Sequence, residues 1–161
     1  VEVVTVPDTQ LTLTLVHSEN VNKEHYTADA CIVCCIDDRF SSLLANFAKR
    51  KCLKKIDWIK VAGGAQKLSP ILINTSPIAD YAIYGYLSKQ ITKSIELHHT
   101  KRVILIEHVE CGAYGGEKNE LFYAKELQKI KPAVEDHLRT SGYPVPVTAY
   151  LAKFDGLYEV K

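Results

Sequence analysis

Short apolar runs alternate with helical patterns along this chain, and this alternation limits the folds that the chain can adopt. Ala30–Ile36 is an unbroken apolar run of strand length, typical of a central strand that is buried on both faces. Ile56–Val61 is interpreted as a second strand of this kind, and Arg102–Glu107 as a third. Helical patterns separate these strands. We therefore predict an α/β fold with a mostly parallel central sheet flanked by helices.

Helices are predicted where apolar residues recur every three or four positions. Ser41–Lys51 is one such segment, with Leu44, Phe47 and Ala48 on one side. Ser76-Pro77 predicts the start of a longer helix, with Ser as N-cap and Pro at the first helical position. The apolar face of this helix is Ala79, Ile83, Leu87, Ile91 and Ile95. A further helix is indicated by Leu121, Ala124, Leu127, Ile130, Val134 and Leu138.

Two further segments are predicted to be strands. Leu11–Leu15 alternates with period two, as a half-buried strand does. Pro146–Phe154 is interpreted as the final strand, with a turn at Asp155-Gly156. A length of 161 residues suits one core, so residues 1–161 are predicted to be a single domain.

Charge and cysteine content narrow the functional classes. A net charge of +1 argues against nucleic acid as a partner. The longest uncharged stretch, Thr140–Ala152, is too short and too polar to span a membrane, so no membrane partner is expected. The five cysteines form an odd set, and no leader pattern is visible in VEVVTVPDTQ. We therefore expect reduced thiols and a cytoplasmic location.

Residues with metal-binding chemistry follow two of the predicted parallel strands. Cys35 ends one strand and His108 and Cys111 follow another, and such strand ends are where sites form in parallel sheets. One His and two Cys are the ligand number of a catalytic zinc site that keeps a fourth position open. The alternative is that these are buried thiols and a packed imidazole. Cys31, Cys34 and Cys52 are expected to be core residues.

Asp37 and Arg39 lie directly behind Cys35. A guanidinium can hold a carboxylate through two hydrogen bonds, which keeps it ionised and able only to accept. Such a carboxylate could orient a hydroxide beside a metal, although a purely structural ion pair is the alternative. Asp38 is expected to be a surface or capping residue. Gly63 and Gly64 are expected to let the backbone approach the pocket closely, and Gly112 to allow a tight turn.

The pattern Cys35-x-Asp37-x-Arg39 with His108-x-x-Cys111-Gly112 resembles the β-class carbonic anhydrases. The resemblance runs from about Ala30 to Gly112, and more weakly includes Tyr150–Val160, which is similar to the closing strand of that family. It implies that Cys35, His108 and Cys111 bind Zn²⁺ and that Asp37 and Arg39 form a catalytic dyad. The implied reaction is that of a carbonate dehydratase, a lyase in which a zinc-bound hydroxide reversibly converts carbon dioxide to bicarbonate. The implied assembly is a homodimer or a higher homo-oligomer.

The chain also departs from that family. Glu107 and Ala113 stand where the family usually has glycine, the loop reads Lys60-Val61-Ala62-Gly63-Gly64, and a strand-rich segment replaces the N-terminal helices. Two alternatives therefore remain: hydrolysis of a related heterocumulene (carbon disulfide or carbonyl sulfide) on the same site, or an inactive zinc-containing binding module. Some family members have a closed state in which the aspartate binds zinc. Candidates for proton carriers or pocket residues, which could equally be surface or packing residues, are His98, His99, Glu107, Glu110 and Tyr114.

Overall fold

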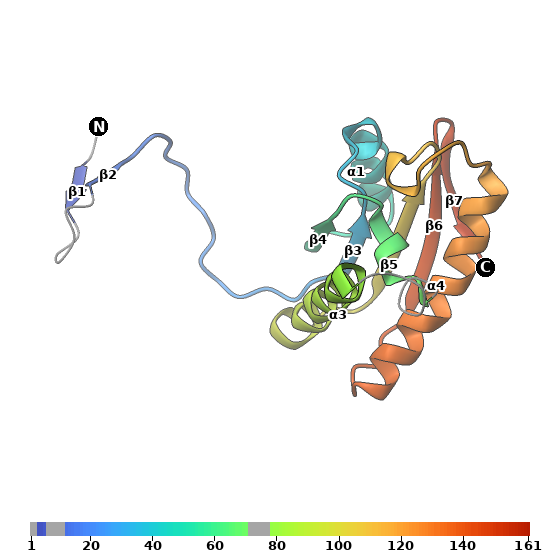
Figure 1. The fold of residues 1–161 in the computed structure, drawn as a ribbon. Helices are drawn as coiled ribbons and strands as arrows, with labels where there is room; N and C mark the ends of the chain where they lie inside the picture. Colours follow the sequence, from blue (N-terminus) through green and yellow to red (C-terminus); the bar gives the residue numbers. More distant parts are fainter. Residues whose placement is uncertain (1–2, 6–11, 71–77) are drawn as a thin grey trace.

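β3 (Ala30–Cys34) lies inside the main sheet, and all of its residues are buried. The structure is a computed structural model that describes residues 3–5, 12–70 and 78–161. Within these residues the strand order of the main sheet is β4-β3-β5-β6-β7 (Figure 1). The other strands of this sheet are β4 (Ile56–Lys60), β5 (Val103–His108), β6 (Val147–Lys153) and β7 (Gly156–Val160). All neighbours pair in parallel except β7, which confirms the predicted α/β fold with a mostly parallel sheet.

The direction in which the chain winds through the sheet reverses once. From β3 the chain passes through α1 (Ser41–Arg50) to β4 at the edge. It then returns through α3 (Ile78–His98) to β5 and continues through α4 (Glu120–Thr140) to β6. Right-handed crossovers place α1 on one face of the sheet and α3 and α4 on the other. The reversal opens a crevice beyond the carboxyl ends of β3 and β5, where ligands bind in sheets of this type.

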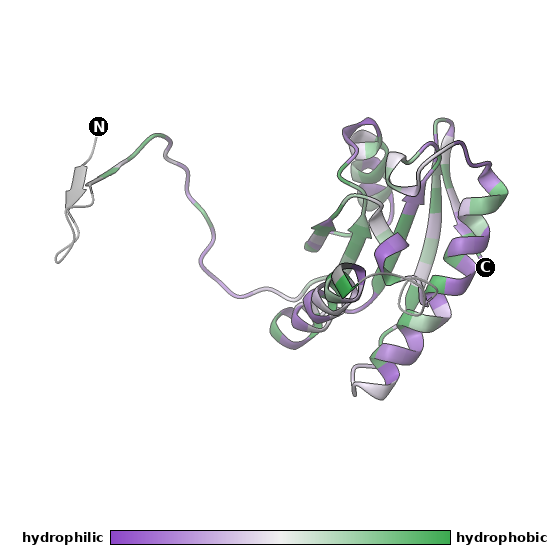
Figure 2. Ribbon diagram, viewed as in Figure 1, coloured by the Kyte–Doolittle hydropathy of each residue, from purple (hydrophilic) through white to green (hydrophobic). Residues whose placement is uncertain are grey.

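The core lies between the central strands and the helices. Figure 2 shows the hydrophobic residues concentrated on the central strands, with hydrophilic residues on the outer sides of α1 and α4. In α3, the predicted inward positions Leu87, Ile91 and Ile95 are buried. In α4, Leu127 and Leu138 are buried as predicted, together with Ile130 and Val134. Leu121 is instead 59% exposed, because it lies on a different side of the helix from the buried residues Tyr123, Leu127 and Ile130.

Two element predictions differ from the structure, and a third lies outside the described residues. Ile56–Val61 was expected to be buried on both faces, but β4 is half-exposed, because β3 is its one neighbour among the described strands. The predicted final strand Pro146–Phe154 corresponds to β6, but β7 follows the turn and pairs with it antiparallel. Ser76-Pro77 lies outside the described residues, and α3 is described from Ile78 onward. No helix in the described segments is both long and apolar enough to cross a membrane.

The N-terminal segment extends away from the main sheet (Figure 1). β1 (Val3–Thr5) pairs antiparallel with β2 (Thr12–Thr14) in a separate two-stranded sheet. Leu13 is 51% exposed, so the expectation of a half-buried strand at Leu11–Leu15 is wrong for the described residues there. The alternating pattern correctly predicted a strand, but Leu13 of this strand is not packed against the main sheet. Tyr26 ties the segment to the domain by donating a hydrogen bond to Asp57 Oδ1 at 2.7 Å. That residues 1–161 form one domain stays a prediction.

The cysteines outside the candidate site divide into two groups. Cys31 and Cys34 are buried in β3 as expected, and burial raises the pKa of their thiols to about 12 and about 11. Cys52 is exposed, so the expectation that it is a core residue is wrong. It lies in the left-handed region (φ 54°) just after α1, and Leu53 turns inward in its place.

Candidate metal centre

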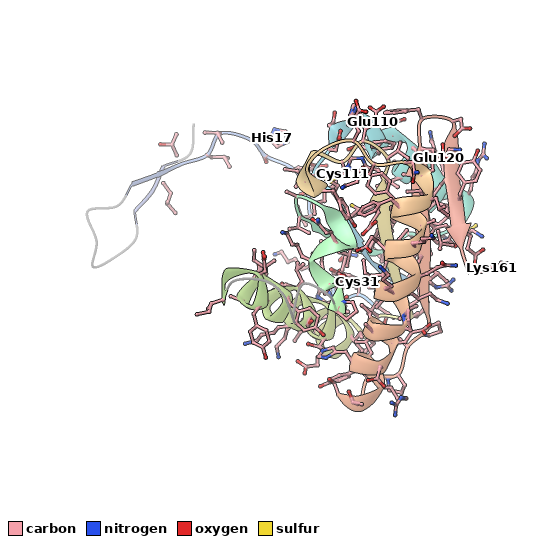
Figure 3. The ribbon with its side chains drawn as sticks, turned by 45° about the vertical axis from the view of Figure 1, so that its right-hand side comes forward. His17, Cys31, Glu110, Cys111, Glu120 and Lys161 are labelled. Atoms are coloured by element: carbon pink, nitrogen blue, oxygen red, sulfur yellow. The ribbon has the colours of Figure 1, made fainter. Side chains whose placement is uncertain are left out.

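Two adjacent parallel strands bring the three predicted metal ligands together. Cys35 follows the last residue of β3, His108 is the last residue of β5, and Cys111 follows in the next turn. One donor atom from each of the three lies within 4.8 Å of the other two. The two thiol sulfurs are 4.0 Å apart, although the cysteines are 76 positions apart in sequence. In Figure 3, Cys111 and Glu110 lie near one end of the sheet, while Cys31, in the first half of β3, lies well below them.

A hydrogen bond to one ring nitrogen of His108 leaves the other nitrogen free to bind a metal. Its Nδ1 is 2.8 Å from the carbonyl oxygen of Val109. A carbonyl only accepts, so Nδ1 carries the proton and Nε2 of the neutral ring carries a lone pair. His108 is 4% exposed, and Nε2 has no hydrogen-bond partner among the described residues. A buried acceptor without a partner is costly unless something else binds it.

Cys111 stands at the start of the turn that follows β5. It is the N-cap of η3 (Gly112–Tyr114), and its side chain makes no capping hydrogen bond. Burial raises the pKa of the Cys111 thiol to about 11. A divalent cation reverses this preference, because a coordinated thiol is deprotonated outright. A tight turn does begin at Gly112, as expected, although Gly112 itself does not need positive φ; the left-handed backbone occurs at Glu110 (φ 57°).

The donor set fits zinc. Zinc binds thiolate sulfur at about 2.3 Å and imidazole nitrogen at about 2.0 Å in tetrahedral geometry, which separates two sulfur ligands by roughly 3.8 Å. The observed sulfur separation of 4.0 Å is close to this value. A ring nitrogen of His108 lies within 4.8 Å of both sulfurs, and Nε2 is the nitrogen without a partner among the described residues. The hydrogen bond from Nδ1 to a backbone carbonyl is the support that metal-binding imidazoles usually have. Three protein ligands leave a fourth position for a small molecule.

Asp37 and Arg39 form a close ion pair beside these ligands. The guanidinium donates from Nη2 to Asp37 Oδ2 at 2.7 Å and from Nε to both carboxylate oxygens at 3.1 Å. Asp37 also caps η1 (Asp38–Phe40) by accepting the Arg39 backbone N–H. Hydrogen bonding from Arg39 lowers the pKa of Asp37 to about 2. Asp37 Oδ2 lies 3.7 Å from His108 Nε2, so this ionised carboxylate borders the candidate metal position.

Aromatic residues that were not singled out in the sequence hold this pair in place. The ring of Phe40 packs on that of His108 with centroids 4.6 Å apart. Phe154, in the turn between β6 and β7, stacks on Phe40 and lies 5.5 Å from the Arg39 guanidinium. Phe40 could have been suspected because it follows Arg39 directly. Phe154 has no such signal, because only the return of the chain through β6 brings it to the site.

The glycine pair behaves as expected. Gly63 (φ 87°) and Gly64 (φ 55°) connect β4 to η2 (Gly64–Leu68) through left-handed backbone. A Cβ on Gly64 would lie 2.6 Å from the carbonyl oxygen of Ile106 and 3.1 Å from the nitrogen of Cys35. The segment that follows β4 therefore contacts β5 and the end of β3 directly through its backbone.

The remaining candidates lie in different places. The backbone carbonyl of His98 accepts a hydrogen bond from Ala28, just before β3 begins, which places His98 and the adjoining His99 at the opposite end of the sheet from the metal ligands. Glu110 is exposed, and its carboxylate is 3.7 Å from Arg39 Nη1. It lines a cavity of about 470 Å³ with Cys111 and Gly112. Asp38 is exposed, as expected.

Glu107 is buried next to the candidate metal centre and does not line the cavity beside Cys111. It is 1% exposed, and burial raises its pKa to about 8. Tyr114 donates a hydrogen bond from its hydroxyl to Glu107 Oε1. Oε2 has no partner within the part of the chain that the structure describes. Sequence reasoning noted Glu107 and Tyr114 separately, but nothing in the sequence paired them.

Comparison with known proteins identifies related sequences and folds. A family model described as "Putative carbonic anhydrase" matches residues 25–159. Among curated proteins, no sequence matches the chain significantly. The crystal structure of β-carbonic anhydrase isoform I from Trichomonas vaginalis is similar over 89% of this chain and 87% of that one, with 17% identity and a TM-score of 0.51.

Two further solved structures have lower similarity scores. A tetrameric β-carbonic anhydrase from Sordaria macrospora matches 84% of this chain and 82% of that one, at 13% identity and a TM-score of 0.48. A carbon disulfide hydrolase matches 84% of this chain and 81% of that one, at 12% identity and a TM-score of 0.48. At these identities a structural likeness concerns the fold alone.

Proposed function

The chain belongs to the putative carbonic anhydrase family, whose model matches residues 25–159, and on this basis we propose that it is a zinc-dependent carbonic anhydrase. The observation that carries the proposal is the buried, unpartnered Nε2 of His108 between two thiols and an ionised aspartate. In this proposal Cys35, His108 and Cys111 hold Zn²⁺, and Asp37 and Arg39 are the catalytic pair. The reaction is the reversible hydration of carbon dioxide to bicarbonate with release of one proton.

Zinc, when bound, supplies chemistry by lowering the pKa of a coordinated water toward neutrality. The protein groups around it determine how that chemistry is used. Arg39 holds Asp37 ionised, so Asp37 can only accept a hydrogen bond. Asp37 would accept the hydrogen of a hydroxide held beside it, and this would direct a lone pair of the hydroxide toward carbon dioxide. The proton released in the cycle passes to solvent or buffer.

The positive charge of Arg39 contributes in a second way. Two thiolates and a neutral imidazole offset the 2+ charge of zinc, which makes the metal a weaker acid than one held by three histidines. Arg39 Nη2 and His108 Nε2 both approach Asp37 Oδ2, at 2.7 Å and 3.7 Å, so the guanidinium adds positive potential to the pocket. Positive charge nearby favours the ionised form of water.

Asp37→Asn tests the proposal because the amide has nearly the shape of the carboxylate but presents N–H donors. We expect stopped-flow measurements to show carbon dioxide hydration by the parent protein, and a loss of about 10²-fold or more in the variant. Zinc content, measured on the same preparations, should be equal. Background rates for both proteins at full zinc occupancy would contradict the enzyme proposal and leave the zinc-containing binding module. Turnover of carbon disulfide or carbonyl sulfide without carbon dioxide hydration would favour the heterocumulene alternative.

We further propose that the protein works in the cytoplasm as a homodimer or higher homo-oligomer. The exposed aromatic side chain of Phe154 beside Arg39 supports an assembly in which the mouth of the pocket is covered. Light scattering of the purified full chain measures the assembly directly. A monomer at micromolar concentration would contradict this part of the proposal without affecting the proposed reaction.

A further inference from the structure

We propose that Glu107 and Tyr114 are positioning residues that close the loop carrying two of the three candidate metal ligands and so hold Cys111 toward His108. The inference rests on the proposed metal centre. It concerns the loop 107–114, which contains both His108 and Cys111 and whose two ends are joined by the hydrogen bond from the Tyr114 hydroxyl to Glu107 Oε1.

The position of Glu107 on the strand excludes a direct role at the metal. Successive residues of a strand point to opposite faces of the sheet. His108 directs its imidazole toward the two thiols, so Glu107, one position earlier in β5, points to the other face. Its carboxyl group therefore acts on the site through Tyr114 and not by contact with a reacting atom.

The Tyr114 side of the bond is held firmly. The Tyr114 ring packs edge-on against Phe122 and Tyr123, with centroids 5.3 Å and 5.2 Å away. Tyr123 is fully buried in α4, and its hydroxyl oxygen accepts the backbone N–H of Cys111 at 3.2 Å. The turn with Cys111 is thus fixed from two directions: by Tyr123 through its backbone and by Glu107 through Tyr114.

The loop needs such restraint because its backbone is unfavourable by itself. Glu110, directly before Cys111, lies in the left-handed region at φ 57°. A residue other than glycine keeps this conformation only where the surrounding structure imposes it. Glu110 is exposed, and its own contact with Arg39 is a long ion pair at 3.7 Å between partly exposed groups. Such pairs restrain a backbone weakly. The part-buried hydrogen bond between Tyr114 and Glu107 closes the same loop on the other face of the sheet.

The burial of Glu107 fits a specific structural role. A carboxyl group that is 1% exposed and has one oxygen without a partner among the described residues is expensive to keep in a core. An apolar residue would avoid that cost but could not accept from Tyr114. The hydrogen bond is therefore the interaction that the carboxyl group supplies.

Tyr114→Phe tests the inference because it removes one oxygen and keeps the ring. Tyr143→Phe is the matched control, since it removes another tyrosine–glutamate hydrogen bond, to Glu96, away from the ligands. Glu107→Gln keeps an acceptor oxygen and should rescue the function of the bond. Each full-length protein is loaded with Zn²⁺, and the rate of zinc loss to excess chelator is measured. Cobalt-loaded samples report the ligand geometry through thiolate charge-transfer absorption.

We expect Tyr114→Phe to lose zinc about 10-fold faster and to shift the cobalt spectrum, as loss of an outer support usually does. Tyr143→Phe should match the parent, and Glu107→Gln should stay within about threefold of it. Amide hydrogen exchange of the metal-free protein does not depend on zinc. It should rise in Tyr114→Phe alone at Cys111 and Tyr114, whose N–H groups donate to the Tyr123 hydroxyl and to the Cys111 carbonyl. Unchanged exchange and zinc loss in that variant would overturn the inference, as would an equal change in the control. Absent carbon dioxide hydration with the expected zinc and exchange results would contradict the proposed reaction alone.

Discussion

Cys34 and Cys35 are neighbours in sequence but face different surroundings. Cys34 is buried in β3, and burial raises the pKa of its thiol to about 11. Cys35 lies one position beyond the strand, partly exposed, with its sulfur 4.0 Å from that of Cys111. The strand end thus separates a packing thiol from a candidate ligand within one residue.

This contrast predicts opposite results for two serine substitutions. Cys35→Ser should lower zinc occupancy at fixed free zinc by at least about 10-fold, because a serine hydroxyl is a poor zinc ligand. Cys34→Ser should keep zinc but lower the free energy of unfolding by about 1–3 kcal/mol, because it buries a hydroxyl. Native mass spectrometry and urea denaturation measure the two effects. Equal zinc loss in both variants would contradict the assignment.

At the same scale, the sequence predicted which residues meet but not all that supports them. Cys35, Asp37 and Arg39 are close together in the chain, and the rule for parallel strand ends connects them to His108 and Cys111. The packing of Phe154 on Arg39 and the bond from Tyr114 to Glu107 depend on side-chain directions after two turns. No periodicity or spacing carries that information.

At the scale of elements, η2 depends on the close approach of bare backbone to two strand ends. Gly64→Ala should therefore be strongly destabilising, since its φ is 55° and the new Cβ would lie 2.6 Å from Ile106 O. We expect a loss of roughly 2 kcal/mol or more in the free energy of unfolding. Gly112→Ala is the matched control: no atom lies within 4 Å of its Cβ position and its φ is not positive, so a change within about 0.5 kcal/mol is expected.

Urea denaturation of both glycine variants measures this difference. Comparable destabilisation of the two would mean that the approach of η2 to β3 and β5 is less close than described. Element identity was largely predictable from apolar periodicity, as the buried positions of α3 and α4 show. The edge position of β4 was not, because the pattern in Ile56–Val61 records apolar content and not the number of neighbouring strands.

At the scale of the whole molecule, the buried carboxyl group of Glu107 should make global stability depend on pH. In the folded protein burial raises its pKa to about 8, whereas the unfolded chain has the ordinary value of 4.5. Between these values the unfolded chain releases a proton that the folded protein retains. The stability associated with this residue is therefore full below pH 4.5 and is lost as pH rises toward about 8.

Glu107→Gln removes the titrating group, so the difference between parent and variant isolates its effect. In the metal-free proteins, the free energy of unfolding of the parent should fall relative to that of the variant by up to about 1.4 kcal/mol per pH unit across this window. Urea denaturation at several pH values between about 5 and 8 provides the measurement. Parallel pH profiles for the two proteins would show that the carboxyl group is not held protonated.

Glu107 and His108 point to opposite faces of the sheet, and this also helps to specify the register of β5. A slip of β5 by one residue against β3 and β6 would exchange the two side chains between the faces of the sheet. The imidazole would then enter the aromatic packing around Tyr114 and Tyr123, and the carboxyl group would face two thiols. Glu107 would lose its hydrogen bond from Tyr114, and His108 would lose its place beside the two thiols. One pair of adjacent polar residues therefore penalises the misaligned pairing twice, in a strand whose apolar residues, buried on both faces, would barely distinguish one register from the next.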